Sequence, residues 1–511
     1  MGSLRRAVVI GSGTAGLASA GFLARDGFEV VGLEAADALG GYLAPVVRDG
    51  FVFDAGLHYV GACRPGQLVF DLLTSLGIDV PALFCELDPD GYDVLRFPDL
   101  DVRVCRPLVE YRERLSGLFP DEAKGIRQFF GVLGGASKMH DALGHSLFGK
   151  PELSDLVALT GVPALLGASQ RPLSDLIQQC VTDPRLRGVL AGQSGAWALP
   201  PSRVVGLAAL LYMAHFSDGA FFPRGGGAGL RDALVSAAER KGATFRTGVV
   251  VERIVVERGR VSGVILGNGD RIDADLVVST ADPTVTLGRL VGAEFVPTSL
   301  RRKAAVIEPS MATFQVFLGL RRDIRSYGFG ASNVWLHPSY DIESAFAARF
   351  TGRLPTRPML FVSPTSLKDD SGKLAPPGCS TLIVTTYVPY AKFRKWQWLS
   401  PEERSAGYGA MQAELSRWVL GELEARCPGL VGDIAVCEYG TPLSAFERTR
   451  AVDGAPFGAA MTMSQWGPAG FRTRTPVAGL LLAGAGIFGG GIGPCVLSGL
   501  AASVMAKLGP R

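Results

Sequence analysis

Three glycines near the N-terminus have the spacing of a dinucleotide-binding turn. The run Gly11-Ser12-Gly13-Thr14-Ala15-Gly16 follows the apolar segment 7–10 and precedes an Ala/Leu-rich segment that ends near Arg25. Such a turn needs glycine to leave the strand tightly, to let the backbone approach a pyrophosphate, and to let the helix pack on the sheet. The first turn of the helix then presents free N–H groups and a positive dipole end to the phosphates.

A carboxylate stands where the ribose of such a dinucleotide would be held. Glu34 lies 18 residues after Gly16, at the end of the apolar segment 28–33. Its oxygens can accept hydrogen bonds from a ribose diol, and its charge would repel a 2′-phosphate, so the site favours FAD or NAD over NADP. The glycine pair Gly40-Gly41 follows. Such a pair suits a backbone that runs beside a flavin and therefore favours FAD.

The other end of the chain carries a further glycine series. The run 484–489 follows the apolar residues 480–483 and by itself suggests a second nucleotide site. Only 22 residues remain after Gly489, and they contain no Asp or Glu, so no second strand with a ribose-binding acid can follow. We therefore expect a strand, a loop against the first cofactor, and a closing helix over 494–507, with Pro494 in its first turn.

His58, Tyr59 and Arg224 are the candidates for catalytic acid–base chemistry. His58 and Tyr59 follow the segment 53–57, which we expect to run past the flavin. Because an unperturbed imidazole titrates near pH 6.5, His58 could protonate a substrate carbanion, the alternative being a packed residue that orients the loop. Arg224 precedes Gly225-Gly226 and could bind the cofactor or a substrate carbonyl, the alternative being a structural pair with an acid.

Together these motifs resemble the phytoene desaturase family of FAD-dependent oxidoreductases, with its carotenoid isomerase and retinol saturase branches, within the wider amine-oxidase-like flavoprotein fold. The likeness runs from end to end through the segments 9–16, 34–41, 53–56, 223–226, 277–282, 480–484 and 489–499. Residues 53–61 look most like the retinol saturase branch. Tyr42 departs from the pattern, because many relatives carry Arg or Lys after the glycine pair, and this puts the redox tuning and electron acceptor in question.

The resemblance implies which residues contact FAD. Val251 would place its backbone against adenine or be a plain strand residue, and Phe488 would flank the flavin or belong to the core. The implied cofactor-binding set is Gly11, Gly13, Thr14, Ala15, Gly16, Glu34, Ala35, Gly40, Gly41, Tyr42, Gly56, Leu57, His58, Val251, Ala281, Gly484, Ile487, Gly491 and Ile492. No metal site is expected.

The expected fold class is α/β. A Rossmann-type FAD-binding domain of the glutathione-reductase and amine-oxidase kind would be assembled from residues 1–65, 219–289 and 465–511. Residues 66–218 and 290–464 would form an α+β substrate domain with a mixed sheet, which closes an apolar cavity over the flavin. The patterns predict strands over 249–257, 260–266, 312–319 and 380–387, and helices over 204–215, 230–241 and 402–423.

Composition excludes several classes of protein. Apolar residues make up 47% of the 511 residues and the formal net charge is only +3, so a disordered chain and a nucleic-acid-binding surface are both disfavoured. None of the eight cysteines forms a C-x-x-C pair, which argues against a zinc site and a disulfide scaffold and suggests a reducing compartment. A P-loop, an HExxH motif and a serine nucleophile elbow are not found, which disfavours NTPases and hydrolases.

Two uncharged stretches imitate targeting segments. Residues 7–24 resemble a leader, and residues 479–506 resemble a membrane span. Both stretches are interrupted by glycines, and each glycine destabilises a helix by about 1 kcal/mol relative to alanine. The default location is therefore cytoplasmic. Peripheral membrane contact is a further expectation, with 204–215 as the candidate surface-dipping helix and a core helix as its alternative.

The expected function is FAD-dependent saturation or desaturation of a carbon–carbon bond in a long, apolar, conjugated polyene. Carotenoids, retinoids and polyene polyketides are the substrate classes, and hydride addition could be coupled to cyclisation in secondary-metabolite biosynthesis. A saturase would need NAD(P)H or another donor, and a desaturase would need oxygen or a quinone. The alternatives are a redox-neutral polyene isomerase, an amine oxidase and a non-enzymatic flavin-bound scaffold. The sequence does not indicate the oligomeric state.

Overall fold

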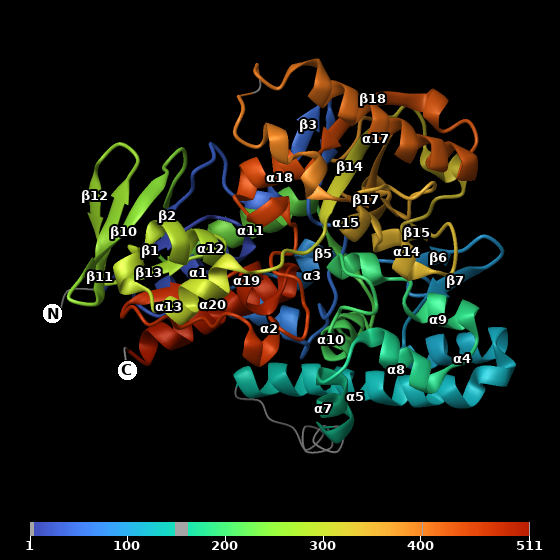
Figure 1. Cartoon of the computed structure of the whole chain (residues 1–511), viewed down its shortest axis with the longest axis horizontal. Coiled ribbons are helices and arrows are strands. Elements are labelled where there is room, and N and C mark those ends of the chain that lie inside the picture. Colours follow the sequence, from blue (N-terminus) through green and yellow to red (C-terminus); the bar gives the residue numbers. More distant parts are fainter. Residues whose placement is uncertain (1–4, 149–161, 401, 510–511) are drawn as a thin grey trace.

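The structure is a computed structural model of the chain and describes residues 5–148, 162–400 and 402–509 (Figure 1). At one end of the molecule lies a parallel sheet built around β1 (Arg6–Ile10), whose apolar residues are all buried. The strand order is β19 (Leu480–Leu482), β13 (Leu276–Ser279), β1, β2 (Glu29–Leu33) and β9 (Thr244–Arg246). This is the Rossmann-type core that the sequence predicts, with strands from both ends of the chain side by side.

Two helices from opposite ends of the chain pack against each other on this sheet. They are α1 (Thr14–Arg25), which is buried from Ala15 to Ala24, and α20 (Ile492–Lys507). The contact is close at Gly499, where an added methyl group would lie 2.8 Å from the backbone nitrogen of Ser19. On its other side α1 packs against α11 (Gly226–Glu239).

The remaining strands of this part form two smaller sheets. The predicted hairpin over 249–266 is confirmed as the antiparallel pair β10 (Val251–Glu257) and β11 (Arg260–Leu266), extended by β12 (Arg271–Asp273). A second antiparallel pair, β3 (Val46–Arg48) and β4 (Phe51–Phe53), leads into the segment that carries Asp54 and His58.

A seven-stranded mixed sheet forms the second part of the molecule. Its strand order is β18 (Ile434–Gly440), β14 (Ala312–Leu320), β17 (Ser380–Val388), β16 (Leu360–Ser363), β15 (Asn333–Leu336), β6 (Asp93–Arg96) and β7 (Asp101–Val104). Only the β15–β6 pair is parallel. The predicted strands over 312–319 and 380–387 are therefore confirmed as neighbours in one sheet, and every residue of β17 is buried.

The helices of the second part cover this sheet and extend below it in Figure 1. The longer ones are α4 (Leu108–Leu118), α5 (Ala123–Leu147), α7 (Val162–Ser169), α8 (Leu173–Cys180), α10 (Gly206–His215) and α17 (Ser405–Arg426). The predicted helix over 402–423 is confirmed as α17 with both ends shifted by three residues. Its buried face carries Leu415, Val419 and Leu423.

The shorter helices lie at the turns between these elements. They are α2 (Leu68–Ser75), α3 (Val80–Leu83), α9 (Pro184–Leu190), α12 (Pro283–Val285), α13 (Thr298–Ala305), α14 (Ile342–Phe346), α15 (Ala348–Thr351), α16 (Thr365–Lys368), α18 (Pro442–Thr449) and α19 (Ala485–Phe488). Three predicted helix starts need correction. The helix expected from 204 begins at Gly206, the helix expected from 230 begins at Gly226, and the closing helix expected from 494 begins at Ile492.

Helix α10 is not a surface-dipping helix. It contacts α5, α7 and α8, and none of its residues is exposed. Of the two interpretations of 204–215, the core helix is therefore the one that the structure supports, because its apolar residues pack in the interior. Among the described residues, no helix combines the length and the apolar character that crossing a membrane would require.

The two large sheets take their strands from different segments of the chain. The parallel sheet takes its strands from 5–65, 219–289 and 465–509, and the mixed sheet takes its strands from 66–148 and 290–464 apart from residue 401. One small sheet joins the two sets, because β5 (Phe84–Glu86) pairs with β8 (Phe221–Pro223). The domain boundaries themselves stay a prediction, and residues 1–4 and 510–511 of the predicted FAD-binding pieces lie outside the described residues.

Three imidazoles with lowered pKa values make the stability of this fold depend on pH in the acid range. Burial lowers the pKa of His58, His215 and His337 to about 3 in each case. The Nε2 atom of His215 accepts a hydrogen bond from the backbone N–H of Gly61 at 3.0 Å, which needs the neutral ring.

We expect stability to fall as the pH is lowered from about 6.5 towards 3, because over this window the unfolded chain binds protons that the folded imidazoles do not. The midpoint of thermal unfolding, measured across this range, checks the expectation. His215→Asn should lose part of the pH dependence relative to the unchanged protein. An identical slope for both would show that this ring is not neutral in the fold.

Candidate cofactor and active site

The first glycine turn is shaped for close backbone approach on one side and open space on the other. Gly11 has a φ of +92°, which favours glycine, and a methyl group on Gly16 would lie 1.9 Å from the Gly11 carbonyl oxygen. At Gly13, by contrast, an added methyl group would meet nothing within 4 Å. Gly11 and Gly16 therefore build the turn, whereas Gly13 leaves free the space that a pyrophosphate would occupy above the start of α1.

The carboxylate of Glu34 lies beside this turn. Its Oε2 accepts hydrogen bonds from Ser12 N at 2.9 Å and Ser12 Oγ at 2.6 Å, and its Oε1 accepts one from Ala36 N at 2.9 Å. These bonds fix the acid at the end of β2, next to the neighbouring residue Ala35. The sequence predicts this position, but it does not reveal that Ser12 holds the carboxylate.

Glycines from three separate segments meet at the turn. A methyl group on Gly41 would lie 3.2 Å from the α-carbon of Gly13, and one on Gly484 would lie 3.4 Å from the Thr280 carbonyl oxygen. Thr280 in turn donates from its hydroxyl to the Ile10 carbonyl at 2.8 Å. Segments that lie hundreds of residues apart in sequence therefore border one space, which we call the glycine cradle. Its residues are Gly11, Gly13, Gly16, Gly41 and Gly484.

The other predicted cofactor contacts surround the same cradle. Val251 begins β10 and is buried, and the nearby Val249 N–H donates to the Glu34 carbonyl at 2.8 Å. Ala281 follows Thr280, and Ile487 lies in α19 after Gly484. The remaining residues of the set border the turn at the start of α1 or the start of α20, namely Thr14, Ala15, Gly40, Gly491 and Ile492.

Asp54 anchors the segment that the sequence places along the flavin. Its Oδ1 accepts a hydrogen bond of 2.6 Å from Gly227 N in the first turn of α11, where a helix favours negative charge. Burial nevertheless raises the pKa of Asp54 to about 7. Gly226 needs to lack a side chain here, because its added methyl would lie 2.4 Å from Asp54 Oδ2.

The residues present fit a bound FAD on observations of this structure. Among the described residues, buried polar atoms without a hydrogen-bond partner include Asp54 Oδ2, His58 Nδ1 and the Tyr42 hydroxyl. Gly56, between Asp54 and His58, is exposed although Leu57 beside it is buried. An exposed glycine backbone flanked by polar groups without protein partners fits a segment that lies against a flavin ring. Burial also raises the pKa of Tyr42 to about 12.

His58 lies against aromatic side chains as a neutral ring. Its imidazole meets the Phe361 ring edge-on with centroids 4.9 Å apart. Burial, followed by the nearby charge of Lys368, lowers the pKa of His58 to about 3. An imidazolium at this position is therefore disfavoured at neutral pH, and a role as proton donor would need a different acid.

Tyr59 is held in a polar network. Its hydroxyl donates to Asp93 Oδ2 at 3.0 Å and lies 2.9 Å from the hydroxyl of Tyr212, and its ring stacks on Phe216 with centroids 4.5 Å apart. Burial, with the nearby Asp93 carboxylate, raises the pKa of Tyr59 well above its usual value. The phenol therefore keeps its proton at neutral pH.

The guanidinium of Arg224 is fully engaged with protein groups. Nε and Nη2 donate to the two carboxylate oxygens of Asp370 at 2.8 and 3.1 Å, and Nη1 donates to the Ala82 carbonyl at 2.8 Å. Arg224 thereby ties the loop before α11 to the end of α3. Its role toward cofactor or substrate stays a prediction.

The sequence did not reveal which residues hold His58 and Tyr59 in place. Lys368 Nζ donates to the His58 carbonyl at 2.9 Å, and Asp93 accepts from Tyr59. The only local signal is that Asp93 begins a buried apolar strand and that Asn333 begins another. Lys368 stands in no motif.

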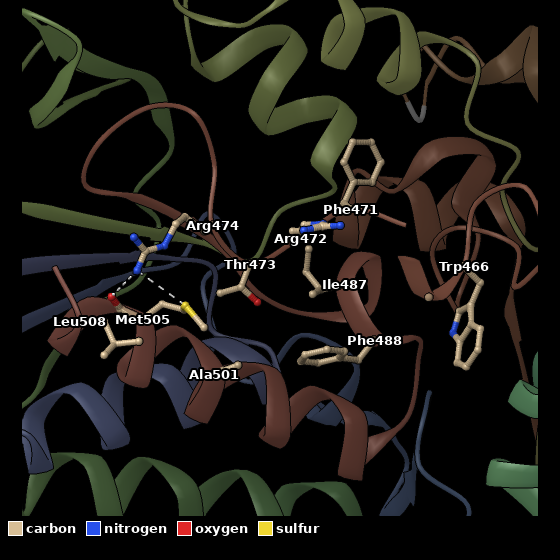
Figure 2. A pocket seen from close by; sticks show the side chains of 11 residues that line it. Trp466, Phe471, Arg472, Thr473, Arg474, Ile487, Phe488, Ala501, Met505 and Leu508 are labelled. Atoms are coloured by element: carbon tan, nitrogen blue, oxygen red, sulfur yellow. Dashed lines mark hydrogen bonds between the residues drawn. The ribbon is translucent and has the colours of Figure 1, made fainter. Parts of the chain in front are cut away.

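A cleft lies beside α20 and α19 (Figure 2). It has a volume of about 760 Å³ between α20, α19 and the loop 466–474, and Figure 2 shows the Phe488 ring next to α20. Phe488, predicted to flank the flavin or to belong to the core, is 40% exposed here, so the core interpretation is wrong. The cleft is lined by Trp466, Gly467, Phe471, Arg472, Thr473, Arg474, Ile487, Phe488, Ala501, Met505 and Leu508.

Comparisons with known proteins agree with this architecture. The sequence profile of the flavin containing amine oxidoreductase family matches residues 14–505. The all-trans-retinol 13,14-reductase of Danio rerio is 24% identical over 94% of this chain and 82% of its own length. The neurosporene-forming phytoene desaturase of Cereibacter sphaeroides is 28% identical over 99% and 94%. The crystal structure of an oxidoreductase from Methanosarcina mazei superposes with a TM-score of 0.64 at 20% identity, covering 98% of this chain and 99% of that one.

The glycine turn offers a matched pair of substitutions. Gly13→Ala should leave the thermal midpoint near that of the unchanged protein but weaken FAD binding at least about tenfold, about 1.4 kcal/mol, because the methyl enters open space above the turn. Gly16→Ala should destabilise the fold by about 1–3 kcal/mol, because its methyl collides with the Gly11 carbonyl. Thermal unfolding and FAD titration by fluorescence distinguish the two. Equal effects of both changes on folding would contradict the assignment of Gly13.

Proposed function

The chain belongs to the flavin containing amine oxidoreductase family, and we propose that it saturates or desaturates a carbon–carbon bond in a long, apolar, conjugated polyene. Carotenoids, retinoids and polyene polyketides are the proposed substrate classes. Two relatives support this choice, because one is named as an all-trans-retinol 13,14-reductase and the other as a neurosporene-forming phytoene desaturase.

The observation that carries the proposal is the path of residues 54–59. This segment leaves the glycine cradle at Asp54 and enters an aromatic cluster at His58 and Tyr59. The rings of Trp335 and Phe361 meet there with centroids 4.4 Å apart. A reacting group beside the cofactor would therefore meet aromatic faces, which suit recognition of an apolar polyene by shape.

The protein's own residues have separate roles in this proposal. A bound FAD supplies the transfer of hydride to or from carbon. Tyr59 is the proposed group that holds or moves a proton at the substrate, because its hydroxyl stays protonated between Asp93 and Tyr212. His58 acts as a neutral ring that shapes the site, and Arg224 holds the loop before α11.

The direction of the reaction determines whether the protein needs an electron donor or an electron acceptor. Saturation would draw electrons from NAD(P)H or another donor, and desaturation would pass them to oxygen or a quinone. Hydride addition to a polyene would also leave a nucleophilic carbon beside other double bonds, so cyclisation is a further proposed outcome.

Mass spectrometry of a polyene after incubation with the FAD-loaded protein tests the proposal. We expect a gain of two mass units with NADPH or NADH under anaerobic conditions, or a loss of two with a quinone. Tyr59→Phe should lower the rate at least about tenfold while FAD stays bound, within the range that a lost proton-transfer group costs. An unchanged mass with altered geometry would identify an isomerase, hydrogen peroxide released with an amine would identify an amine oxidase, and bound FAD without turnover would identify a scaffold.

We also propose a cytoplasmic location with contact to an anionic membrane surface through the cleft in Figure 2. Leu508 and Phe488, which line it, are 69% and 40% exposed, and the exposed Arg472 stands beside them without an acidic residue in the lining. Exposed apolar side chains beside basic ones are attracted to anionic lipid surfaces. Such contact would suit substrates that partition into lipid.

Cosedimentation with phosphatidylcholine vesicles, with and without phosphatidylserine, checks the membrane contact. We expect binding that needs phosphatidylserine and weakens with salt, and Arg472→Glu should reduce it about fivefold or more. Trp398→Ser is the matched control, because Trp398 is 78% exposed outside the cleft. Equal binding by the Arg472 variant and the unchanged protein would remove this surface from the proposal.

A further inference from the structure

A buried chain of polar groups crosses from the mixed sheet to the segment that carries His58 and Tyr59. It consists of Lys368, Asn333 and Asp93, which we call the buried charge relay. Lys368 follows β16 in α16, Asn333 begins β15, and Asp93 begins the adjacent strand β6. The three residues belong to two separate insertions of the sequence.

Lys368 is buried with all its donors used. The side chain is 4% exposed, and Nζ donates to the His58 carbonyl at 2.9 Å, to Ser363 Oγ at 2.7 Å and to Asn333 Oδ1. The ammonium group also lies 5.6 Å from the centroid of the Phe222 ring. Lysine is almost never fully buried unless paired, and here each direct partner is neutral.

Asp93 is equally enclosed and accepts four hydrogen bonds. The residue is 0% exposed, and its Oδ2 accepts from Gln193 Nε2 at 2.6 Å, Trp335 Nε1 at 3.1 Å and Tyr59 Oη at 3.0 Å. Its Oδ1 accepts from Asn333 Nδ2 at 3.0 Å. Burial raises the pKa of the Asp93 carboxyl, and the four hydrogen bonds that it accepts oppose this rise.

The amide of Asn333 joins the two charges. Its oxygen accepts from Lys368 and its nitrogen donates to Asp93, so the positive and negative groups are linked in one orientation. The two ends of the relay then hold consecutive residues, the carbonyl of His58 and the hydroxyl of Tyr59. Apolar side chains of similar volume could fill this interior with similar or greater stability, so burial of the charges points to a functional role.

We propose that Lys368 and Asp93 are positioning residues for the redox site, and that the Lys368 ammonium raises the reduction potential of the flavin bound along residues 54–58. No bond to either residue forms or breaks. The positive charge favours the electron-rich reduced cofactor, and the two hydrogen bonds keep His58 and Tyr59 in place beside it. This inference rests on the proposed function only in placing FAD along that segment.

The charge on Lys368 should itself depend on pH. Burial lowers the pKa of Lys368 to about 7, against the opposing effect of the carboxylates of Asp93 and Asp54, which are the charged groups facing it from other elements. Asp369 is its neighbour in sequence and bonds to Gly225 N at 3.0 Å instead. The effect on the flavin should thus be present in acid and fade as the amine loses its proton.

The test measures the reduction potential of the bound FAD by equilibration with a reference dye under anaerobic conditions. At about pH 6, Lys368→Gln should shift the ratio of reduced to oxidised flavin at least tenfold toward the oxidised form, which is about 30 mV for a two-electron couple. The difference from the unchanged protein should shrink above about pH 8, where the native amine is neutral. Glutamine keeps a donor for the His58 carbonyl, so a merely structural contact would be largely retained.

Two further variants complete the test. Lys373→Met removes an exposed lysine five residues away and should leave the potential unchanged. Asp93→Asn removes the facing carboxylate, so the pH at which the Lys368 contribution disappears should move down by a measurable amount. If Lys368→Gln does not fold, Asp93→Asn carries the test alone, because an unmoved titration in a folded, FAD-bound protein overturns the inference.

The outcomes separate this inference from the proposed function. If the unchanged protein binds no FAD, the proposed function and the inference fail together. If it binds FAD and changes the mass of a polyene, but the Lys368→Gln difference is absent or independent of pH, the relay is structural and the inference alone is wrong. A shift that follows the amine titration supports it.

Discussion

The structure depends on glycine backbones that meet at the end of β1. A methyl group on Gly16 would collide with the Gly11 carbonyl, and Gly41 and Gly484, which lie near Gly13 and Thr280, have φ values of +56° and +96° that favour glycine. Each contact brings a different part of the chain to the end of β1. Because the start of α1 and the loop before α20 both depend on these approaches, the glycines fix the two helix starts and the strand ends that form the cradle.

From this cradle, one short segment connects the cofactor part to the substrate part. Asp54 is bound to the first turn of α11, whereas His58 and Tyr59 are bound to side chains of the mixed sheet. The segment is thus held at its two ends by different parts of the molecule. Gly56 and Leu57 lie between these two anchors.

The sequence predicted the features that depend on local chemistry. Glycine spacing and an acid at the end of β2 carry their meaning in a few adjacent residues, so the turn at Gly11 and the place of Glu34 were predictable. The relay was not, because Asp93 lies 240 residues before Asn333 and meets it and Lys368 only when β6 pairs with β15. The two interpretations of 204–215, a surface-dipping helix and a core helix, could not be separated for a related reason, since an apolar helix looks the same in sequence whether protein or lipid surrounds it.

The way the polar groups satisfy one another bears on what the site can bind. The hydroxyl of Tyr59, the carboxylate of Asp93 and the ammonium of Lys368 are all hydrogen-bonded to other protein groups. A substrate without polar groups cannot compensate an unpaired buried donor or acceptor, which would cost about 1–3 kcal/mol. A site for a polyene must therefore saturate its own polar atoms before the substrate arrives, whereas a site for an amine gains by leaving an acceptor free. The enclosed carboxylate of Asp93 is held as the first case requires, whereas the unpartnered His58 Nδ1 lies on the segment proposed to contact FAD. This arrangement favours an apolar substrate at the aromatic faces beside His58 and Tyr59.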